Sequence, residues 1–405
     1  MSMKKIKTEK DGRREEKIEQ VLSRNVEDVI DREHLRAALL SGKKLRVKLG
    51  IDPTSPDLHL GHAVVLRKLR EFQDLGCVAV LIVGDFTGQI GDPTGRAEAR
   101  KPLTADAVKK NMEHYFAQAK KILEPRKMEV AYNSSWFEKE GVMGLTRLAA
   151  KATFQQVIKR ADFKQRIDAE QDITFLELLY PLLQGYDSVK VKADVELGGS
   201  DQMFNVLMGR RIQRQFDMPE QDIMTSPLLE GLDGVKKMSK SLGNYIGLDD
   251  EPNDMFGKVM SVPDALVNKY FMLCTDVSVG EVKKLTEELE PKELKERLGF
   301  EIVTQYHGAV AAKRAQEHFE KVFSRHEMPD DLPELVVAMR KLSALDLAMV
   351  TGELKSRSEA RRLIEQGGFE LDEKIIKNPQ EEISLYGGET LRIGKRRFFK
   401  VKLGK

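Results

Sequence analysis

Two histidines, His59 and His62, lie three residues apart in the tetrapeptide HLGH, where a helix is predicted to begin. A helix N-terminus offers free N–H groups and a partial positive charge, so phosphate groups bind there, and two imidazoles would add hydrogen-bond donors to the same spot. Gly61 between them would let a nucleotide ring approach the backbone. The pair therefore suggests a phosphate site, while a metal site and a simple helix cap are the alternatives.

Lysines and serines are concentrated further along the chain, in the glycine-flanked segment GLDGVKKMSKSLGNY. Within it, Lys237, Lys240 and Ser241 suit a mobile loop that closes over a polyphosphate and supplies positive charge in the transition state. An ordinary solvated loop would have the same composition. The sequence contains no GxxxxGK[ST] phosphate loop that could bind the phosphates instead.

Three polar residues in the segment YPLLQGYD have the spacing of a single helix face. Tyr180, Gln184 and Asp187 stand at positions i, i+4 and i+7, so a substrate pocket and an internal hydrogen-bonded network are equally compatible with them. The segment LGGSDQ then places Gly199 and Asp201 after a predicted strand, where a carboxylate could bind ribose hydroxyls.

The elements that must position these residues alternate between strands and helices. Strands are predicted at residues 45–51, 78–84, 128–133 and 192–199, and the second of these is a continuous apolar run rich in β-branched residues, as expected for a strand buried on both faces. An amphipathic helix is predicted from His59 to Leu75, with Gly76 as its C-terminal cap. Strand, helix and strand in this order form a βαβ unit, so the fold class is α/β, with a doubly wound parallel-sheet (Rossmann-like) domain over residues 35–232.

Three further segments flank this domain. Residues 1–34 form an N-terminal extension, in which apolar residues at three-and-four spacing predict a helix over residues 16–31. Residues 233–335 combine the lysine-serine loop with a charged helical domain and end in a proline-rich acidic linker, residues 328–335. Residues 340–405 form a small α+β domain that begins with short helices and ends in strands.

Charge and cysteine content exclude several classes of protein. The 405 residues include 67 basic and 65 acidic side chains, a net charge of +2. The stretch from Arg392 to Lys405 contains seven basic residues and no acidic one, so the remainder, with 60 basic against 65 acidic residues, is acidic. Two cysteines, Cys77 and Cys274, cannot build a disulfide framework or a four-thiolate zinc site, and we interpret both as core residues. With no signal peptide or membrane span in the sequence, we expect a soluble, cytoplasmic protein.

The two motifs, in this order around a parallel sheet, resemble the His-Ile-Gly-His and Lys-Met-Ser-Lys-Ser signatures of class I aminoacyl-tRNA synthetases. YPLLQGYD, LGGSDQ and GQIGDPTGR (88–96) narrow the resemblance to the bacterial tyrosyl-tRNA synthetase family, from about residue 32 to the C-terminus. The tail is similar to an S4-type RNA-binding domain. Its arginines expected to contact RNA are Arg357, Arg361, Arg362, Arg396 and Arg397.

The resemblance implies a role for each motif residue. Tyrosine would be bound by Asp92, Tyr180 and Gln184 at its ammonium and by Asp187 at its phenol, with Glu196 and Gln202 lining the pocket. ATP would be bound by His59, His62 and Thr54 at the phosphates, by Asp201 and Gly199 at the ribose, and by Asp52, Gly50 and Gly61 near the adenylate. Lys237, Lys240 and Ser241 would join in the transition state, with Arg96 and Arg100 on the pyrophosphate side unless these two are solvated loop charges.

One residue departs from the family pattern. Lys48 stands where well-known members carry a tyrosine beside the substrate phenol. It either points to the other face of its strand or enters the pocket, where its ammonium could pair with Asp187 or donate to the phenol oxygen. Trp136 and Phe137 are expected to pack in the core, and the histidines outside the motif, among them His34, receive no role.

The resemblance implies a tyrosine–tRNA ligase that uses ATP with Mg²⁺, acts on L-tyrosine and tRNA(Tyr), holds no structural metal, has no membrane association and forms a homodimer. Three alternatives remain: a tryptophanyl-tRNA synthetase, a nucleotidyltransferase of a small metabolite, and a non-catalytic RNA-binding relative. A nucleotidyltransferase would not need the lysine-serine loop or the basic tail. A non-catalytic relative would have lost pocket residues such as Asp187 and Asp201, which are present here.

Overall fold

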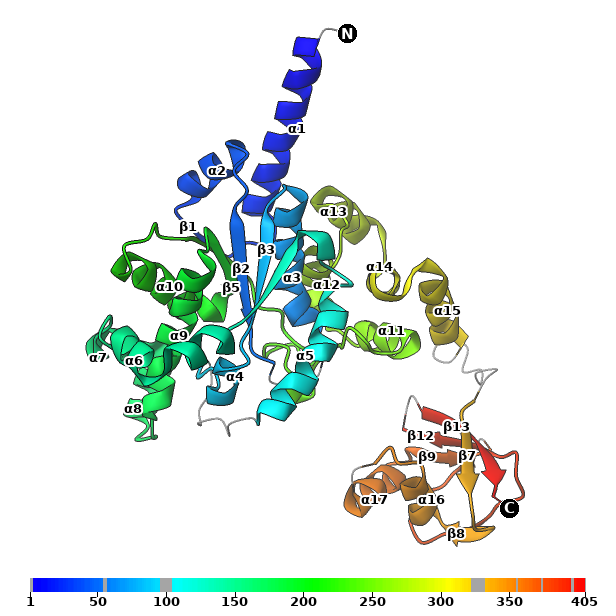
Figure 1. Ribbon diagram of the computed structural model, residues 1–405. Coiled ribbons are helices and arrows are strands. Elements are labelled where there is room, and N and C mark those ends of the chain that lie inside the picture. Colours follow the sequence, from blue (N-terminus) through cyan, green and yellow to red (C-terminus); the bar gives the residue numbers. More distant parts are fainter. Residues whose placement is uncertain are drawn as a thin grey trace. The chain divides into compact units, whose positions relative to one another are not determined.

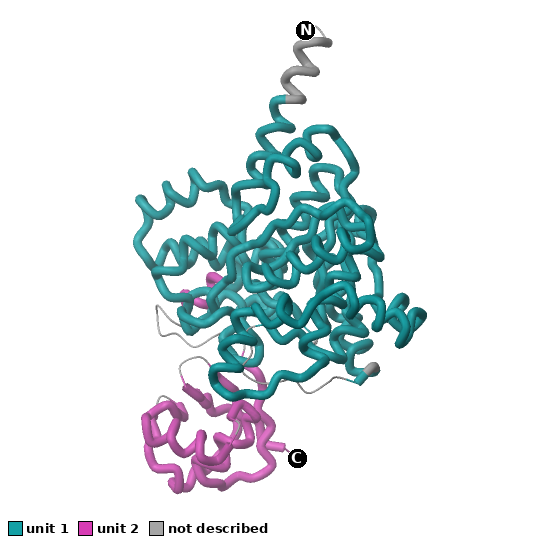
Figure 2. Tube along the Cα trace, turned by 90° about the vertical axis from the view of Figure 1, so that its left-hand side faces the viewer, with its two compact units in different colours: residues 1–315 teal, residues 316–405 magenta. Residues whose placement is uncertain are grey.

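The computed structural model describes residues 3–53, 57–94, 104–321, 332–354, 356–372, 374–394 and 397–404, with backbone alone for residues 3–11 and 105. Four residues with predicted site roles lie outside these ranges: Thr54, Arg96, Arg100 and Arg396. The chain divides into two compact units, residues 1–315 and residues 316–405 (Figure 2).

The first unit is built on a six-stranded sheet with the order β1-β6-β5-β2-β3-β4. Figure 1 labels β1, β2, β3 and β5 of this sheet. Its strands are β1 (Asp28–Ile30), β2 (Arg46–Ile51), β3 (Val78–Val83), β4 (Met128–Tyr132), β5 (Val195–Gly199) and β6 (Asp222–Ser226). All neighbours from β6 to β4 are parallel, and only β1 runs antiparallel, along the free edge of β6. The predicted doubly wound parallel sheet is confirmed.

Helices cover both faces of this sheet. The principal ones are α3 (Leu60–Asp74), α5 (Ala105–Ala119), α6 (Ser134–Ala149), α9 (Phe175–Val191) and α10 (Met203–Gln215). Strand β3 is apolar throughout because it is covered on both sides. Val80 and Ile82 pack toward α6 and the end of α9, whereas Val83 packs against α5.

The order of the strands determines where a ligand can bind. Strand β2 pairs with β3 on one side and with β5 on the other, so the winding direction of the chain reverses at β2. At such a reversal the connections leave the carboxyl ends of the two strands in opposite directions and open a crevice between them. The loops after β2 and β5 carry several of the predicted site residues.

The N-terminal extension differs from the prediction. The helix expected over residues 16–31 is α1 (Met3–Ser23), which ends before residues 28–30, and these form β1 instead. The unpaired edge of β6 offers backbone hydrogen bonds that a longer helix could not reach, and Asn25 and Asp31 turn the chain with positive φ angles. Lys68 Nζ on α3 donates to the carbonyls of Val21 and Arg24 and so holds the end of α1 against the unit.

The remaining elements of this unit are mostly short. They are α2 (Arg32–Leu40), α4 (Thr87–Ile90), α7 (Phe154–Val157), α8 (Ala161–Asp168) and 3-10 turns at Pro125–Lys127, Ser200–Gln202, Lys240–Leu242 and Asp264–Leu266. As predicted for the segment after residue 254, helices follow: α11 (Pro252–Met260), α12 (Val267–Cys274), α13 (Val279–Glu288), α14 (Pro291–His307) and α15 (Ala309–Phe319). No helix in the described ranges is long and apolar enough to cross a membrane.

The second unit is a small α+β fold with its own core. Its elements are β7 (Glu334–Val337), β8 (Lys341–Ser343), α16 (Ala344–Val350), α17 (Arg357–Glu365), β9 (Phe369–Leu371), β10 (Lys374–Ile375), β11 (Glu382–Ser384), β12 (Thr390–Ile393) and β13 (Arg397–Leu403). The predicted strands at the end of the chain are confirmed. The short helices predicted near the start of residues 340–405 are α16 and α17, which follow the three-residue strand β8. The predicted linker is shorter than expected, because β7 begins at Glu334, pairs in parallel with β13 and completes the sheet.

Candidate active site

A cavity of about 620 Å³ opens at the carboxyl ends of β2 and β5, within the size range of small-molecule sites. Most of the predicted site residues line it: Gly50, Asp52, His59, Gly61, His62, Asp92, Tyr180, Gln184, Asp187, Gly199, Asp201, Gln202, Lys237, Lys240 and Ser241. Lys48 and Glu196 are absent from its described wall.

The two histidines stack at the start of α3. His59 is the N-cap residue, its backbone N–H donates to His62 Nδ1 at 3.3 Å, and the ring centroids are 3.9 Å apart. Burial lowers the pKa of His59 to about 2 and that of His62 to about 4. Both rings are therefore neutral near pH 7, and the capping alternative is observed. Nδ1 of His59 is buried without a partner, which leaves a polar atom for a ligand.

Two lysines of the lysine-serine loop are held by carboxylates. Lys237 Nζ lies 2.7 Å from Asp201 Oδ2, and Lys240 Nζ lies 2.5 Å from Asp57 Oδ2. Met238 between them is buried, and its backbone N–H donates to Leu229. The buried methionine anchors the loop, and both lysines line the cavity that the histidines also line.

Asp187 is a buried carboxylate in the wall of the cavity. Trp136 Nε1 donates to its Oδ1 at 3.1 Å, and Asn133 Nδ2 donates to its Oδ2 at 3.4 Å. Burial raises the pKa of Asp187 to about 7, although Lys48 and the two donors oppose the shift. Trp136 packs against the core as expected, and its indole N–H in addition binds this carboxylate.

Tyr180 and Gln184 come from the same face of α9 as Asp187. Tyr180 Oη donates to Asp52 Oδ2 at 2.8 Å, and Gln184 Nε2 donates to Glu196 Oε1 at 3.2 Å. The two alternatives from the sequence, a pocket and an internal network, coincide here. The outer atoms of these side chains line the cavity while their hydrogen bonds hold them in place.

Lys48 lies beneath the cavity, fully buried. Its ammonium donates to Glu196 Oε1 and Ser188 Oγ, each at 2.8 Å, and to the carbonyl of Gln184 at 2.9 Å. Lys48 points toward α9, the helix that carries Asp187, and its ammonium pairs with Glu196 rather than with Asp187. A contact with the substrate phenol stays a prediction.

Glu196 also differs from its predicted place in the pocket wall, because it is the buried counter-ion of Lys48. The ion pair fixes the backbone and the side chain of Gln184 from below.

Asp92 is surrounded by hydrogen-bond donors. Its Oδ1 accepts from the backbone N–H of Thr94 at 3.0 Å and from Thr94 Oγ1 at 2.6 Å, and its Oδ2 accepts from Gln202 Nε2 at 2.8 Å. Asp92 and Asp52, a second carboxylate, both line the cavity beside Tyr180. This concentration of oxygen acceptors suits an ammonium group.

Two residues of this site were not found from the sequence. Thr87 Oγ1 donates to Asp52 Oδ1 at 2.8 Å, and Asn133 Nδ2 donates to that same hydroxyl at 2.9 Å. Asn133 directly follows β4, and a polar residue at the carboxyl end of a parallel strand is the signal that could have found it. Thr87 lies in the short helix α4 and offers no such signal.

The arginines of the second unit lie on and near α17. Arg361 and Arg362 are exposed, and so is Arg357, which pairs with Asp346 at 2.8 Å. Arg397 lies in β13 and pairs with Glu353 at 3.0 Å. As predicted, α17 ends at a glycine turn, Gly367 with φ +77°, and β9 follows.

Two protein-family models match the sequence of this chain. The model for class I tRNA synthetases (W and Y) matches residues 40–324, and the S4 domain model matches residues 345–388. The chain belongs to the class I tRNA synthetases of the tryptophan and tyrosine group, and it carries an S4 domain. Within that group, it resembles the tyrosine–tRNA ligases.

The ligase of Aquifex aeolicus is 44% identical over 384 residues, covering 95% of this chain and 98% of the relative. The ligase of Thermotoga maritima is 46% identical over 389 residues, covering 95% and 97%. Among solved structures, a C-terminally truncated mitochondrial tyrosyl-tRNA synthetase of Aspergillus nidulans superposes with a TM-score of 0.64 at 22% identity, covering 78% of this chain and 100% of the other. At that identity, the superposition supports the fold.

Proposed function

We propose that the chain activates L-tyrosine with ATP to give tyrosyl-adenylate and pyrophosphate, and then transfers tyrosine to the 3′-terminal adenosine of tRNA(Tyr). The observation that carries this proposal is Asp187, a buried carboxylate in the cavity wall with donors on both oxygens. An apolar side chain such as phenylalanine would leave this carboxylate desolvated and short of a donor, whereas a phenol hydroxyl supplies one. Tyrosyl-tRNA synthetase is itself the standard example of such discrimination.

The first step requires positioning rather than a general base. The carboxylate of tyrosine is ionised at neutral pH and attacks the α-phosphorus of ATP as pyrophosphate leaves. Asp92, Tyr180 and Gln184 would hold the ammonium, and Asp201 the ribose. In the second step the terminal ribose hydroxyl of the tRNA, the 2′ hydroxyl by class I analogy, attacks the carbonyl of the adenylate.

Charge on the leaving pyrophosphate would be stabilised by the two signature motifs. Lys237 and Lys240 are paired with Asp201 and Asp57, and a polyphosphate could take over either ammonium. The neutral rings of His59 and His62 would contribute hydrogen bonds rather than charge, as their lowered pKa values require. Thr54, Arg96 and Arg100 are proposed for the same phosphates from the resemblance alone.

Mg²⁺ would arrive with the triphosphate. In the described part of the chain, the one group of three side chains that could share an ion is Asp31, His34 and Asp222. Asp222 is the first residue of β6, so it lies at the opposite end of the strands from the cavity. We therefore infer that the ion is carried by ATP and would neutralise phosphate charge at the cavity.

We propose a homodimer from the exposed apolar side chains of neighbouring helices. Val142 and Met143 on α6, Phe154 on α7 and Phe175 on α9 are each more than half exposed, and α9 contacts both other helices. Such a concentration is typical of an interface with a second copy. Sedimentation of the full chain should give the mass of two copies. A cytoplasmic location is proposed with it.

We propose that the four segments of the chain, residues 1–34, 35–232, 233–335 and 340–405, have separate tasks, and that the S4 domain binds tRNA through its arginines. Truncation after residue 321 should spare tyrosine activation and strongly reduce tRNA charging. An equal loss of both activities would contradict the proposed division of labour.

Pyrophosphate exchange with ATP, measured with each of the twenty amino acids, tests the substrate. We expect exchange with tyrosine alone. Tryptophan is the informative competitor, because its indole N–H could also donate to Asp187. Exchange with tryptophan, or with none of the amino acids, would contradict the proposal.

A further inference from the structure

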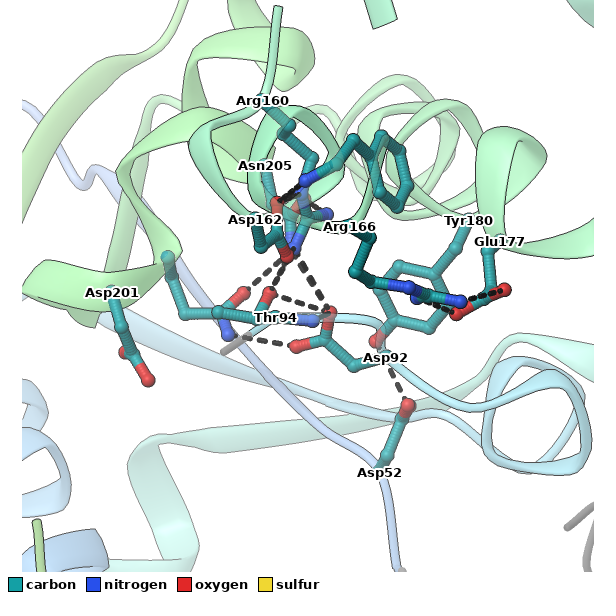
Figure 3. A network of polar contacts seen from close by, with 12 residues as sticks. Asp52, Asp92, Thr94, Arg160, Asp162, Arg166, Glu177, Tyr180, Asp201 and Asn205 are labelled. Carbon is teal, nitrogen blue, oxygen red and sulfur yellow. Dashed lines mark hydrogen bonds and ion pairs between the residues drawn. The ribbon is translucent and has the colours of Figure 1, made fainter. Parts of the chain in front are cut away.

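Arg160 is a buried guanidinium that lies just behind the cavity. It is the N-cap residue of α8, its side chain is 3% exposed, and it lies 5.1 Å from the ring of Phe163. Nε and Nη2 donate to the two oxygens of Asp162 at 2.8 and 2.9 Å. Nη1 donates to Asn205 Oδ1 at 3.0 Å, and Nη2 donates to Thr94 Oγ1 at 2.8 Å (Figure 3).

The bond to Asn205 sets the direction of two amides. A guanidinium has no acceptor, so the atom of Asn205 that faces it must be the oxygen, and the amide nitrogen must point the other way. That nitrogen donates to Gln202 Oε1 at 2.7 Å. Gln202 is thereby oriented with its own nitrogen toward Asp92 Oδ2, at 2.8 Å.

The bond to Thr94 sets the direction of a hydroxyl. Thr94 Oγ1 accepts from Arg160 and, at 3.3 Å, from Asn205 Nδ2, which occupies both of its lone pairs. Its single hydrogen is left to point at Asp92 Oδ1, at 2.6 Å. Two routes of hydrogen bonds therefore lead from Arg160 to Asp92, one through Thr94 to Oδ1 and one through Asn205 and Gln202 to Oδ2. The bond from Asn205 to Thr94 links the two routes, and Asn205 Nδ2 also lies 3.5 Å from Asp92 Oδ1.

The net charge of this cluster is also complementary to a positively charged ammonium group. Asp162 pairs with the guanidinium through both oxygens, while Asp92 Oδ1 is 4.0 Å from Nη2. Two carboxylates against one guanidinium leave one net negative charge. Asp92 borders the cavity and Arg160 is absent from its described wall, so this negative charge is the part that a ligand meets.

We propose that Arg160 is a positioning residue for the α-ammonium of the amino-acid substrate, and that it acts by fixing both oxygens of Asp92 through Thr94, Asn205 and Gln202. The inference rests on the proposed function and adds a determinant of substrate binding that does not touch the substrate. It also predicts which part of tyrosine is affected. The ammonium subsite should depend on Arg160, and the phenol subsite around Asp187 should not.

Arg166 provides a matched control. It lies on the same helix, α8, is equally buried, and pairs with Glu177 Oε1 at 2.6 Å, as the separate contact in Figure 3 shows. We would compare Arg160→Gln with Arg166→Gln in the full chain, using pyrophosphate exchange for the KM values of tyrosine and ATP. Desamino-tyrosine, which lacks the ammonium, would be measured in parallel as a competitive inhibitor.

Arg160→Gln should raise the KM for tyrosine about tenfold or more, the effect of one lost charge-assisted hydrogen bond, and leave the KM for ATP within about twofold. Arg166→Gln should leave both KM values within about twofold. The inhibition constant of desamino-tyrosine should be unchanged in Arg160→Gln. An unchanged KM for tyrosine, or an equal weakening of desamino-tyrosine, would overturn the inference.

Thr94→Val tests the same chain of bonds without touching a buried charge, in case Arg160→Gln does not fold. It should also raise the KM for tyrosine, and the double variant should be less than additive if the arginine acts through the hydroxyl. Full additivity would contradict that route. If the unaltered chain shows no pyrophosphate exchange with tyrosine, the proposed function is wrong. If the unaltered chain shows this exchange but the variants do not have the expected KM values, only the role of Arg160 is wrong.

Discussion

The ionisation of Asp187 should make tyrosine binding depend on pH. Burial raises the pKa of this carboxylate from its usual value near 3.8 to about 7. Its two neighbours, Trp136 and Asn133, are donors and leave it to accept a third hydrogen bond from a phenol. A ligand that prefers the ionised form binds more tightly as pH rises through the pKa of the free site, and it releases a proton on binding.

The size of the effect follows from the ionised fraction. With a pKa of about 7, roughly one-tenth of the sites are ionised at pH 6 and roughly nine-tenths at pH 8. The dissociation constant of tyrosine should therefore fall about tenfold between these two pH values. The groups of free tyrosine titrate outside this window, and so do His59 and His62, whose pKa values are lowered to about 2 and about 4.

The chain carries its own reporter for this titration. Trp136 is its single tryptophan, and the indole N–H is bonded directly to Asp187. Its fluorescence should change with a midpoint near pH 7 in the free protein and at lower pH with tyrosine bound. Asp187→Asn should abolish both the fluorescence titration and the pH dependence of binding. A dissociation constant that stays flat between about pH 6 and pH 8 in the unaltered chain would refute the reasoning.

Three further predictions concern other parts of the molecule. Lys48→Met should lower the free energy of unfolding, measured by urea titration, by about 3–5 kcal/mol, because Glu196 stays buried without its counter-ion. Adding Glu196→Gln to this variant should restore most of the lost stability, and a double variant that is no more stable would contradict the pairing. Gly61→Ala would place a Cβ 3.0 Å from the imidazole of His59 and should raise the KM for ATP severalfold. An unchanged KM would show that this ring can move aside. Replacing Arg361 and Arg362 by Gln should weaken tRNA binding and reduce its salt dependence, measured by filter binding, while pyrophosphate exchange stays normal.

Features that depend on local spacing could be predicted from the sequence. The histidine pair at the start of α3 and the three polar residues on α9 occupy the places that their spacing indicates. In both cases the geometry is set by a single helix, whose period is fixed. The cavity at the carboxyl ends of the strands likewise follows from the order of strands and helices.

Features that depend on distant partners could not be predicted. The strand pattern places Lys48 on one face of β2, but its counter-ion Glu196 comes from β5. The role of Arg160 depends on Thr94 and Asn205, from two other parts of the chain. Trp136 is apolar apart from one N–H, and only the fold shows that this N–H meets a carboxylate.

The antiparallel strand β1 has a consequence for synthesis on the ribosome. Residues 28–30 leave the ribosome early, yet their partner is β6, and Thr225 Oγ1 reaches back to Asp28 across 197 residues of sequence. At about 5–20 residues per second, the N-terminal strand must wait about 10–40 s for the edge on which it docks. Until then this short strand has no partner, and the sheet is completed by a segment from the beginning of the chain.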